Sequence, residues 1–232
     1  MKQFTNNRSS EDIVTIVDKI EKESLRENQP HGTYFDLFQA SKVRMYTIIT
    51  AFIWTFCTHT FYGVNQYIGQ LQGNLYLNVL ISALSFVPAL ILVVIATLYL
   101  KRRASVVGSF SIAGISLLVF IFTPETMKWL TLIFAIIGQT AAYAAFVQIY
   151  LFTSELFPTI VRNSAMGFSS VFGRFGGFIA PFVVNIGVEW GSIIIFSLVA
   201  FAAALLCYFL PETKDRVLLD SIEQTEKIPN KD

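Results

Sequence analysis

The chain has 232 residues, of which 54% are hydrophobic and 14% are charged, and its mean hydropathy is +0.58. Soluble domains carry about 25% charged residues, so this composition indicates a membrane protein and argues against a soluble domain. The net charge of +1 gives no reason to expect a nucleic acid as a partner. Cys57 and Cys207 both lie within apolar runs, which favours lipid- or core-facing thiols over a disulfide or a metal site.

Residues 1–44 form a polar cytoplasmic lead with no apolar run of the kind that a secretory signal needs. Within it, residues 9–28 are predicted to form an amphipathic helix, because one stripe is apolar and the charges lie elsewhere. The stripe consists of Ile13, Ile16, Val17 and Ile20. Two interpretations stay open: the helix lies against a membrane bundle from the cytoplasmic side, or it is solvated or frayed.

Six apolar segments follow, and each is long enough to cross a bilayer, which takes about 20 residues of α-helix. They cover residues 45–68, 74–100, 105–123, 127–151, 163–186 and 190–210. The sequence therefore predicts an all-α membrane protein with six transmembrane helices, followed by a cytoplasmic tail at 211–232. Pro88 and Pro181 interrupt the second and fifth segments, where kinks commonly line a cavity.

The connections between these segments alternate in charge. Basic residues lie in the connections at 101–103 and 155–162 and beyond residue 213, whereas the connections at 69–73, 124–128 and 187–191 are nearly neutral. Cytoplasmic connections of membrane proteins carry an excess of Lys and Arg. Both termini and the basic connections are therefore predicted to lie in the cytoplasm.

Arg174 stands near the middle of the fifth segment, roughly 16–18 Å from either end at the rise of an α-helix. A charge at this depth is costly, so it normally faces a bundle interior or a water-filled path and marks a functional site. The alternative is a structural arginine bonded to backbone carbonyls. No acidic partner is present within the apolar segments. In the same segment, small residues at steps of four predict close helix packing: Ala165, Ser169, Gly173, Gly177 and Pro181.

Polar and aromatic side chains concentrate in the first and fourth segments, whereas the third and sixth are almost purely apolar. We expect the polar segments to line a cavity and the apolar ones to face lipid. His59, in the first segment, is more often a satisfied core residue than a ligand. The sequence shows no Ser/His/Asp set, no Cys-x-x-Cys pair and no phosphate-binding glycine loop, so neither an enzyme nor a cofactor site is expected.

Two motifs carry a family resemblance, ELFPTIVRN at residues 155–163 and PETK at 211–214. With them, the chain resembles the major facilitator superfamily, and more narrowly the organic cation, anion and carnitine transporter family of animals. The stretches GNLYL at 73–77 and RFGG at 174–177 support the narrower assignment. The resemblance runs from about residue 35 to about residue 226.

The resemblance implies a carrier of twelve spans, of which this chain is the carboxy-terminal half preceded by part of the central cytoplasmic loop. Substrate would bind near the midplane between the two halves, as carriers of this kind arrange it. The family's cavity positions fall on Trp54, Phe61, Tyr62, Phe86, Phe146, Val147, Ser170 and Arg174. Its inner charge network, thought to latch the inward gate, falls on Glu155, Arg162, Glu212 and Lys214.

The chain departs from the family's pattern at informative positions. Cation carriers have an acid where this chain has Phe86 and tend to have Asp where it has Arg174, whereas anion and carnitine carriers have Arg there. The anion carriers' lysine in the second span is replaced by Leu90, and LYLKRR at 98–103 keeps the family's basic pair without its Asp and Gly.

We therefore expect transport of a small anionic or zwitterionic, carnitine-like organic ion by alternating access, together with an amino-terminal half and in the plasma membrane. No cofactor, metal or nucleic acid is expected as a partner. Two alternatives stay open. The chain is an organic cation transporter, or it is a truncated, non-transporting membrane protein that acts as a partner of a full-length carrier.

Overall fold

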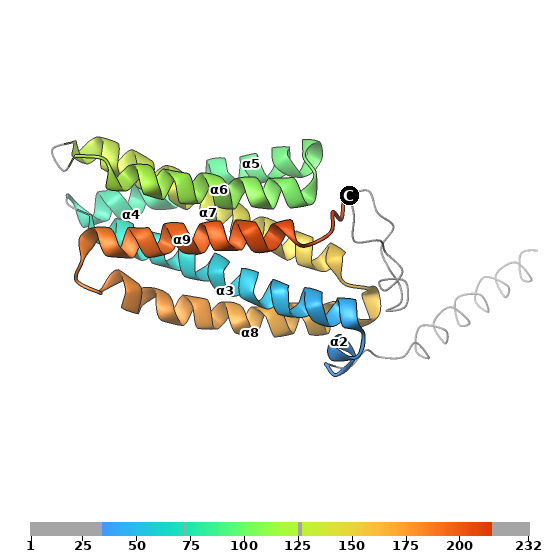
Figure 1. Ribbon diagram of the computed structural model, residues 1–232. Coiled ribbons are helices and arrows are strands. Elements are labelled where there is room, and N and C mark those ends of the chain that lie inside the picture. The colour runs from blue at the N-terminus through green and yellow to red at the C-terminus, as the bar shows by residue number, and fades with distance from the viewer. Residues whose placement is uncertain (1–33, 72, 125–126, 215–232) are drawn as a thin grey trace, which may run out of the picture. The chain divides into compact units, whose positions relative to one another are not determined.

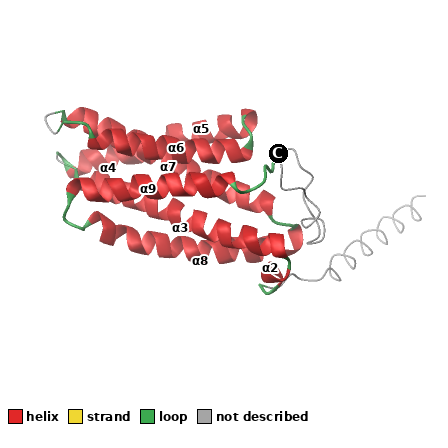
Figure 2. Ribbon diagram, in the orientation of Figure 1, coloured by secondary structure: helices red, strands yellow, loops and turns green. Residues whose placement is uncertain are grey.

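The computed structural model describes residues 34–71, 73–124 and 127–214 (Figure 1). Every regular element in these ranges is a helix (Figure 2), so the prediction of an all-α fold is confirmed. The amphipathic helix predicted at 9–28 lies outside the described residues, as does the predicted tail beyond residue 214. The helices are α2 (Asp36–Gln39), α3 (Ser41–Gln70), α4 (Leu75–Leu84), α5 (Phe86–Tyr99), α6 (Arg102–Ile121), α7 (Lys128–Leu156), α8 (Thr159–Val184) and α9 (Glu189–Tyr208).

The long helices lie side by side in one bundle (Figure 1). Helix α3 packs against α7, α8 and α9, and α6 packs against α7 and α9. The largest apolar core lies between these helices and includes the buried side chains of Trp54, Phe110 and Phe152. Many large apolar side chains face outward instead, for example Ile91 and Leu198. A surface of this kind is stable against lipid but not against water.

Five helical stretches of the described residues are long and apolar enough to cross a membrane: Leu75–Tyr99, Arg102–Ile121, Trp129–Leu156, Thr159–Val184 and Trp190–Tyr208. The first predicted span, 45–68, is the 30-residue helix α3 of the same bundle. Its composition does not identify it as a span, because it carries many polar side chains such as Thr47, Thr50 and Thr58. The third and sixth predicted spans, now α6 and α9, were expected to face lipid. This expectation is wrong in part, because α6 and α9 pack on each other. The span that contains α4 and α5 is less buried than either of them.

The second predicted span is divided into α4 and α5 at Ser85. Pro88 explains the division, because proline offers no N–H to the carbonyl of residue i−4, here Leu84, and its ring crowds that carbonyl. The Ser85 hydroxyl donates instead to the carbonyl of Ser82 at 2.6 Å. Ser82 donates in turn to Oε1 of Gln139 at 2.9 Å. The division is thereby tied to α7.

The connection between α7 and α8 is shorter than the sequence suggests. Helix α7 continues to Leu156 and α8 begins at Thr159, so Glu155 and Arg162 lie within helices rather than in a loop. Pro158 immediately precedes α8, a position where its fixed φ is favourable and its missing N–H costs nothing. Helix α8 then continues through Pro181 to Val184.

Side chains of α3 bind the backbone of α8 directly. Thr55 donates to the carbonyl of Phe172 at 3.1 Å, and Thr58 donates to that of Gly173 at 2.6 Å. The His59 Nδ1 lies 3.2 Å from the Gly176 carbonyl, and since a carbonyl only accepts, this nitrogen carries the proton. His59 is therefore a satisfied core residue.

The buried small residues of α8 are Ala165, Ser169, Gly173, Gly176 and Ala180. The predicted stripe is confirmed as far as Gly173, and beyond it the buried positions are Gly176 and Ala180 rather than Gly177 and Pro181. A helix turns every 3.6 residues, so steps of exactly four drift around its surface. The contact face moves to Gly176, where a Cβ would overlap the carbonyl oxygen of Thr55. Gly177 lies beside this face, against the ring of Tyr62.

Candidate functional site

Aromatic side chains from α3, α5 and α7 form one connected cluster. Phe61 stacks on Phe146 with ring centroids 5.1 Å apart and also contacts Tyr62 and Phe86, at 5.0 and 6.0 Å. Phe86 lies 4.5 Å from Tyr143. The bundle thus brings together four of the predicted cavity residues, although the segments that carry them are far apart in the sequence.

The cluster has a buried base and an exposed edge. Phe61 is only 7% exposed, whereas Tyr62 is 47% and Tyr150 is 41% exposed. Trp54 is 2% exposed, its indole N–H donates to Thr153 at 3.0 Å, and its ring lies 4.4 Å from that of Tyr150. In this structure Tyr150 therefore covers Trp54, and the accessible aromatic surface belongs to Tyr62 and Tyr150.

Tyr143 and Tyr150 are absent from the predicted cavity positions, yet both belong to the cluster. With Phe146 and Val147 they occupy positions i, i+3, i+4 and i+7 of α7, which is one face of a helix. This spacing was visible in the sequence and would have identified them. Val147 is half-buried on the same face.

Arg174 and Ser170 lie on α8, one turn apart. The Ser170 hydroxyl donates to the carbonyl of Gly167 at 3.0 Å. Arg174 is exposed rather than buried, and within the described residues no hydrogen bond or ion pair engages its guanidinium. The interpretation as a structural arginine bonded to carbonyls is therefore not supported by these contacts.

The packing of α8 on α3 brings the part of α8 that carries Arg174 close to the aromatic cluster. One turn further along α8, Gly177 lies against the Tyr62 ring, where a Cβ would come within 3.1 Å of it. The absence of a side chain at Gly177 leaves room for that ring. An aromatic surface and an unpaired cation thus border the same side of the bundle.

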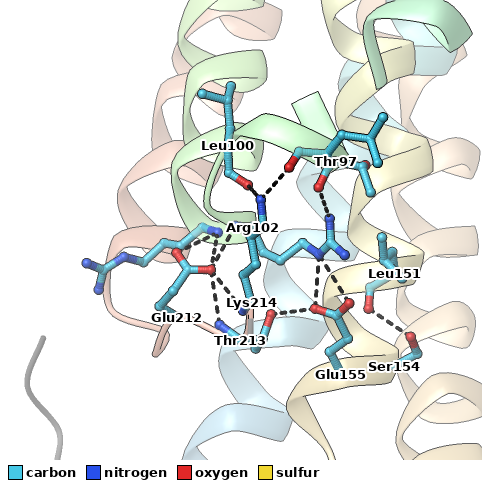
Figure 3. Close-up of polar contacts among 11 residues, drawn as sticks. Thr97, Leu100, Arg102, Leu151, Ser154, Glu155, Glu212, Thr213 and Lys214 are labelled. Atoms are coloured by element: carbon cyan, nitrogen blue, oxygen red, sulfur yellow. Dashed lines mark hydrogen bonds and ion pairs between the residues drawn. The ribbon is translucent and has the colours of Figure 1, made fainter. Parts of the chain in front are cut away.

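A second cluster, formed by polar side chains, joins the ends of α5 and α7 to the start of α6 (Figure 3). The Arg102 Nε donates to both carboxylate oxygens of Glu155, at 3.1 and 3.2 Å. The Thr213 hydroxyl donates to the same carboxylate at 2.7 Å. Arg102 also donates to the carbonyl of Thr97 at 2.8 Å, at the end of α5. Glu155 therefore connects the start of α6 to the PETK motif.

The PETK motif itself caps two helices (Figure 3). The Glu212 carboxylate accepts from the backbone N–H groups of Arg102 and Arg103, at 2.7 and 3.2 Å. An anion is favourable at the amino terminus of a helix, here α6. The Lys214 Nζ donates to the carbonyls of Leu98 and Leu100, at 2.8 and 3.0 Å, where α5 ends. Each charge thus lies at the helix end that favours it.

Of the four predicted gate residues, the structure brings three together, Glu155, Glu212 and Lys214, and adds Arg102. Arg162 is not bound to them. Its Nε and Nη2 are buried, and neither has a hydrogen-bond partner among the described residues. The basic connection at 101–103 is visible in the sequence, but its pairing with residues more than fifty positions away depends on the packing of the bundle.

A bundle of apolar helices that leaves a polar and aromatic face open has the architecture of a membrane carrier. The chain belongs to the Major Facilitator Superfamily, whose family model matches residues 9–181. It is 34% identical over 218 residues to an organic cation transporter protein of Drosophila melanogaster, covering 93% of this chain and 40% of that protein. It is 30% identical to the human organic cation/carnitine transporter 2, covering 92% of this chain and 39% of that protein.

A third relative, solute carrier family 22 member 15-like of Xenopus tropicalis, is 36% identical to this chain. The match covers 83% of this chain and 41% of that protein. The chain thus spans about two fifths of the length of these curated relatives. The family assignment made from the motifs is confirmed, and two of these relatives are named as transporters. No group of three His, Cys, Asp or Glu side chains that could hold a metal ion occurs in the described ranges.

Proposed function

We propose that this chain forms the carboxy-terminal half of an organic-ion carrier and works by alternating access with an amino-terminal half. The observation that carries the proposal is the open face with the exposed rings of Tyr62 and Tyr150, because the unpaired Arg174 is exposed on α8 one turn from Gly177, which lies against the Tyr62 ring. A polar and charged surface of this kind is costly against lipid, so a second bundle that covers it and encloses water would stabilise it. Carriers of this class bind substrate between two such bundles.

The proposed substrate is a small organic anion or a carnitine-like zwitterion. A guanidinium that has no ion pair can hold a carboxylate by two parallel hydrogen bonds. The membrane-spanning parts of the sequence offer no acid near Arg174 that would compete for it. The faces of Tyr62 and Phe146 could receive the quaternary ammonium of a zwitterion by cation–π contact. Trp54, Phe61, Phe86, Val147 and Ser170 would complete the wall of the binding site.

Transport of an organic cation is the second candidate, and two observations favour it. The relatives are named organic cation or organic cation/carnitine transporters, and the aromatic cluster alone would suit a cation. The charge at Arg174 opposes it, because the same guanidinium repels a simple cation. A zwitterion satisfies both the cluster and the arginine, so it is preferred.

For the inner gate, we propose that Glu155, Glu212 and Lys214 hold this half together. Arg162 is then the gate residue, and it pairs with an acidic residue that is not among the residues that the structure describes. The first three already have partners within the bundle. The buried guanidinium nitrogens of Arg162 have none there, and a buried charge is stable only when it is paired. We also propose that the protein lies in the plasma membrane and that the basic end of the bundle faces the cytoplasm.

Coexpression tests the two-half mechanism. This chain is expressed with the amino-terminal half of the Drosophila relative, and uptake of labelled carnitine is measured for both halves together and for each alone. Saturable uptake is expected only when both are present. Saturable uptake by this chain alone in proteoliposomes would indicate a functional homodimer instead. No uptake by the pair, with both halves at the membrane and associated, would favour a non-transporting partner of a full-length carrier.

A further inference from the structure

A cavity of about 730 Å³ lies at the end of the bundle opposite the Glu155 and Glu212 cluster. It is lined where α3 meets α4, where α6 meets α7 and where α8 meets α9, the junctions at the left of Figure 1. By the charge rule this is the outer end. The cavity is separate from the aromatic cluster, because Phe61, Phe86 and Phe146 do not line it. Its volume is within the usual range for a small-molecule site, roughly 300–1,000 Å³.

The floor of the cavity is apolar. Phe120 and Val184 form part of it, are 8% and 6% exposed, and belong to a buried apolar cluster beneath. The Tyr67 ring meets Phe120 edge-on, with centroids 5.8 Å apart. This floor points toward the middle of the bundle, so it would receive the apolar end of a ligand.

The rim of the cavity carries amides. Gln70 donates to Oδ1 of Asn185 at 3.2 Å, and Asn185 donates to the carbonyl of Pro181 at 2.7 Å. Asn78 is 4% exposed and donates to the carbonyl of Leu71 at 3.1 Å. Among the described residues, no donor is bound to the amide oxygens of Gln70 and Asn78, and a hydroxyl of a ligand could donate to them.

Two indoles complete the rim. Trp129 and Trp190 line the cavity and are 71% and 62% exposed. Tryptophan is enriched at the boundary between membrane and water, where its ring bridges apolar and polar surroundings. The cavity is therefore placed at headgroup depth, with its amides toward water and its floor toward the hydrocarbon.

In the part of the chain that the structure describes, no charged side chain lines the cavity. Among these described lining residues an ionised headgroup would find no partner for its charge, and an unpaired buried charge is costly. A hydroxyl, by contrast, can donate to the free amide oxygens and accept from an amide N–H. A rigid apolar body would lose less conformational freedom on binding than a flexible acyl chain.

We propose that this outer cavity binds an uncharged amphiphile with a hydroxyl head and a rigid polycyclic body, the chemistry of a membrane sterol. The hydroxyl lies at the amide rim between Gln70 and Asn78, and the apolar body lies on Phe120 and Val184. This orientation is the one that a sterol already has in the outer leaflet. The site does not depend on the proposed transport of organic ions.

The test uses the full chain in phosphatidylcholine nanodiscs and a cholesterol analogue that carries a photoreactive diazirine and a free hydroxyl. Labelling is expected in peptides that contain residues 67–78 and 184–190, and unlabelled cholesterol should compete. Cholesteryl sulfate, which has the same body and a charged head, should compete about tenfold less well, the loss expected for a buried charge without a partner.

Replacing both indoles, Trp129→Ala with Trp190→Ala, should lower labelling about tenfold, as truncating aromatic contacts commonly does. Val188→Trp narrows the cavity and should also lower it without removing an indole. Tyr99→Ala is the matched control, because Tyr99 is a 79% exposed aromatic residue at the other end of the bundle. Unchanged labelling in both cavity variants, equal competition by the sulfate, or labelling confined to other peptides would each overturn the proposal.

Discussion

Thr58 of α3 donates a 2.6 Å hydrogen bond to the backbone carbonyl of Gly173 in α8. Glycine leaves the surface of α8 open at this position, so the α3 side chains approach it closely. A Cβ at Gly173 would lie 3.3 Å from both the Thr58 methyl group and the Trp54 ring. The close contact of α3 with α8 fixes the position of Arg174 relative to Tyr62, since these two residues lie on the helices that it joins.

Enlarging Gly176 should therefore destabilise the bundle. In Gly176→Ala the new methyl group meets the Thr55 carbonyl, which is backbone and cannot rotate away. We expect a loss of about 1–3 kcal/mol, the usual cost of overpacking, seen as a lower melting temperature in detergent. Gly108→Ala is the control, because nothing lies within 4 Å of a Cβ there. It should be neutral or stabilise α6 by up to about 1 kcal/mol. Equal melting of both variants would show that the close contact is not as the structure has it.

The ion pair of Arg102 with Glu155 should stabilise this bundle even when no amino-terminal half is present. Both side chains are about four-fifths buried, with 18% and 19% exposed. In Glu155→Gln the charge is lost while the shape is kept, and we expect a loss of about 2 kcal/mol, typical for hydrogen bonds to a charged group. A double-mutant cycle with Arg102→Gln isolates the pair. Lys101→Gln, at an exposed neighbour, should have little effect. A coupling energy of zero would mean that the two residues do not act as a pair.

The outcomes for particular residues show where the sequence was sufficient. Pro88 marked the division of the second span, and the apolar segments marked the helices, because both depend on local chemistry. Tyr143 and Tyr150 could have been found from their spacing on α7. The partner of Glu155 could not have been found from the sequence, because the choice between Arg162 and Arg102 depends on how α6 and α8 pack. The same packing decides that Gly176, not Gly177, meets the backbone of α3.

Thiol labelling tests the orientation, because Cys57 and Cys207 are buried and give little background. Phe122→Cys and Val188→Cys place a thiol at the end of the bundle predicted to be outside, where the native side chains are 84% and 41% exposed. Both should react with an impermeant maleimide on intact cells. Tyr99→Cys, at the basic end, should react only after permeabilisation. The reverse pattern would overturn the orientation and the cytoplasmic placement of the Glu155 cluster.

The last prediction concerns the charge preference set by Arg174. At 4 Å and an effective dielectric constant near 20, a guanidinium and a carboxylate attract each other by about 4 kcal/mol, which is an upper bound for an exposed group. The carrier formed with an amino-terminal half is compared as wild type, Arg174→Ala and Arg174→Lys. Uptake of a carboxylate should fall at least about tenfold in Arg174→Ala and be partly kept in Arg174→Lys, where the charge remains but the paired hydrogen bonds are lost. Arg44→Ala removes an exposed cation from the start of α3 and should leave uptake unchanged. If Arg174→Ala takes up carboxylates normally at equal protein level, the anionic substrate assignment is wrong.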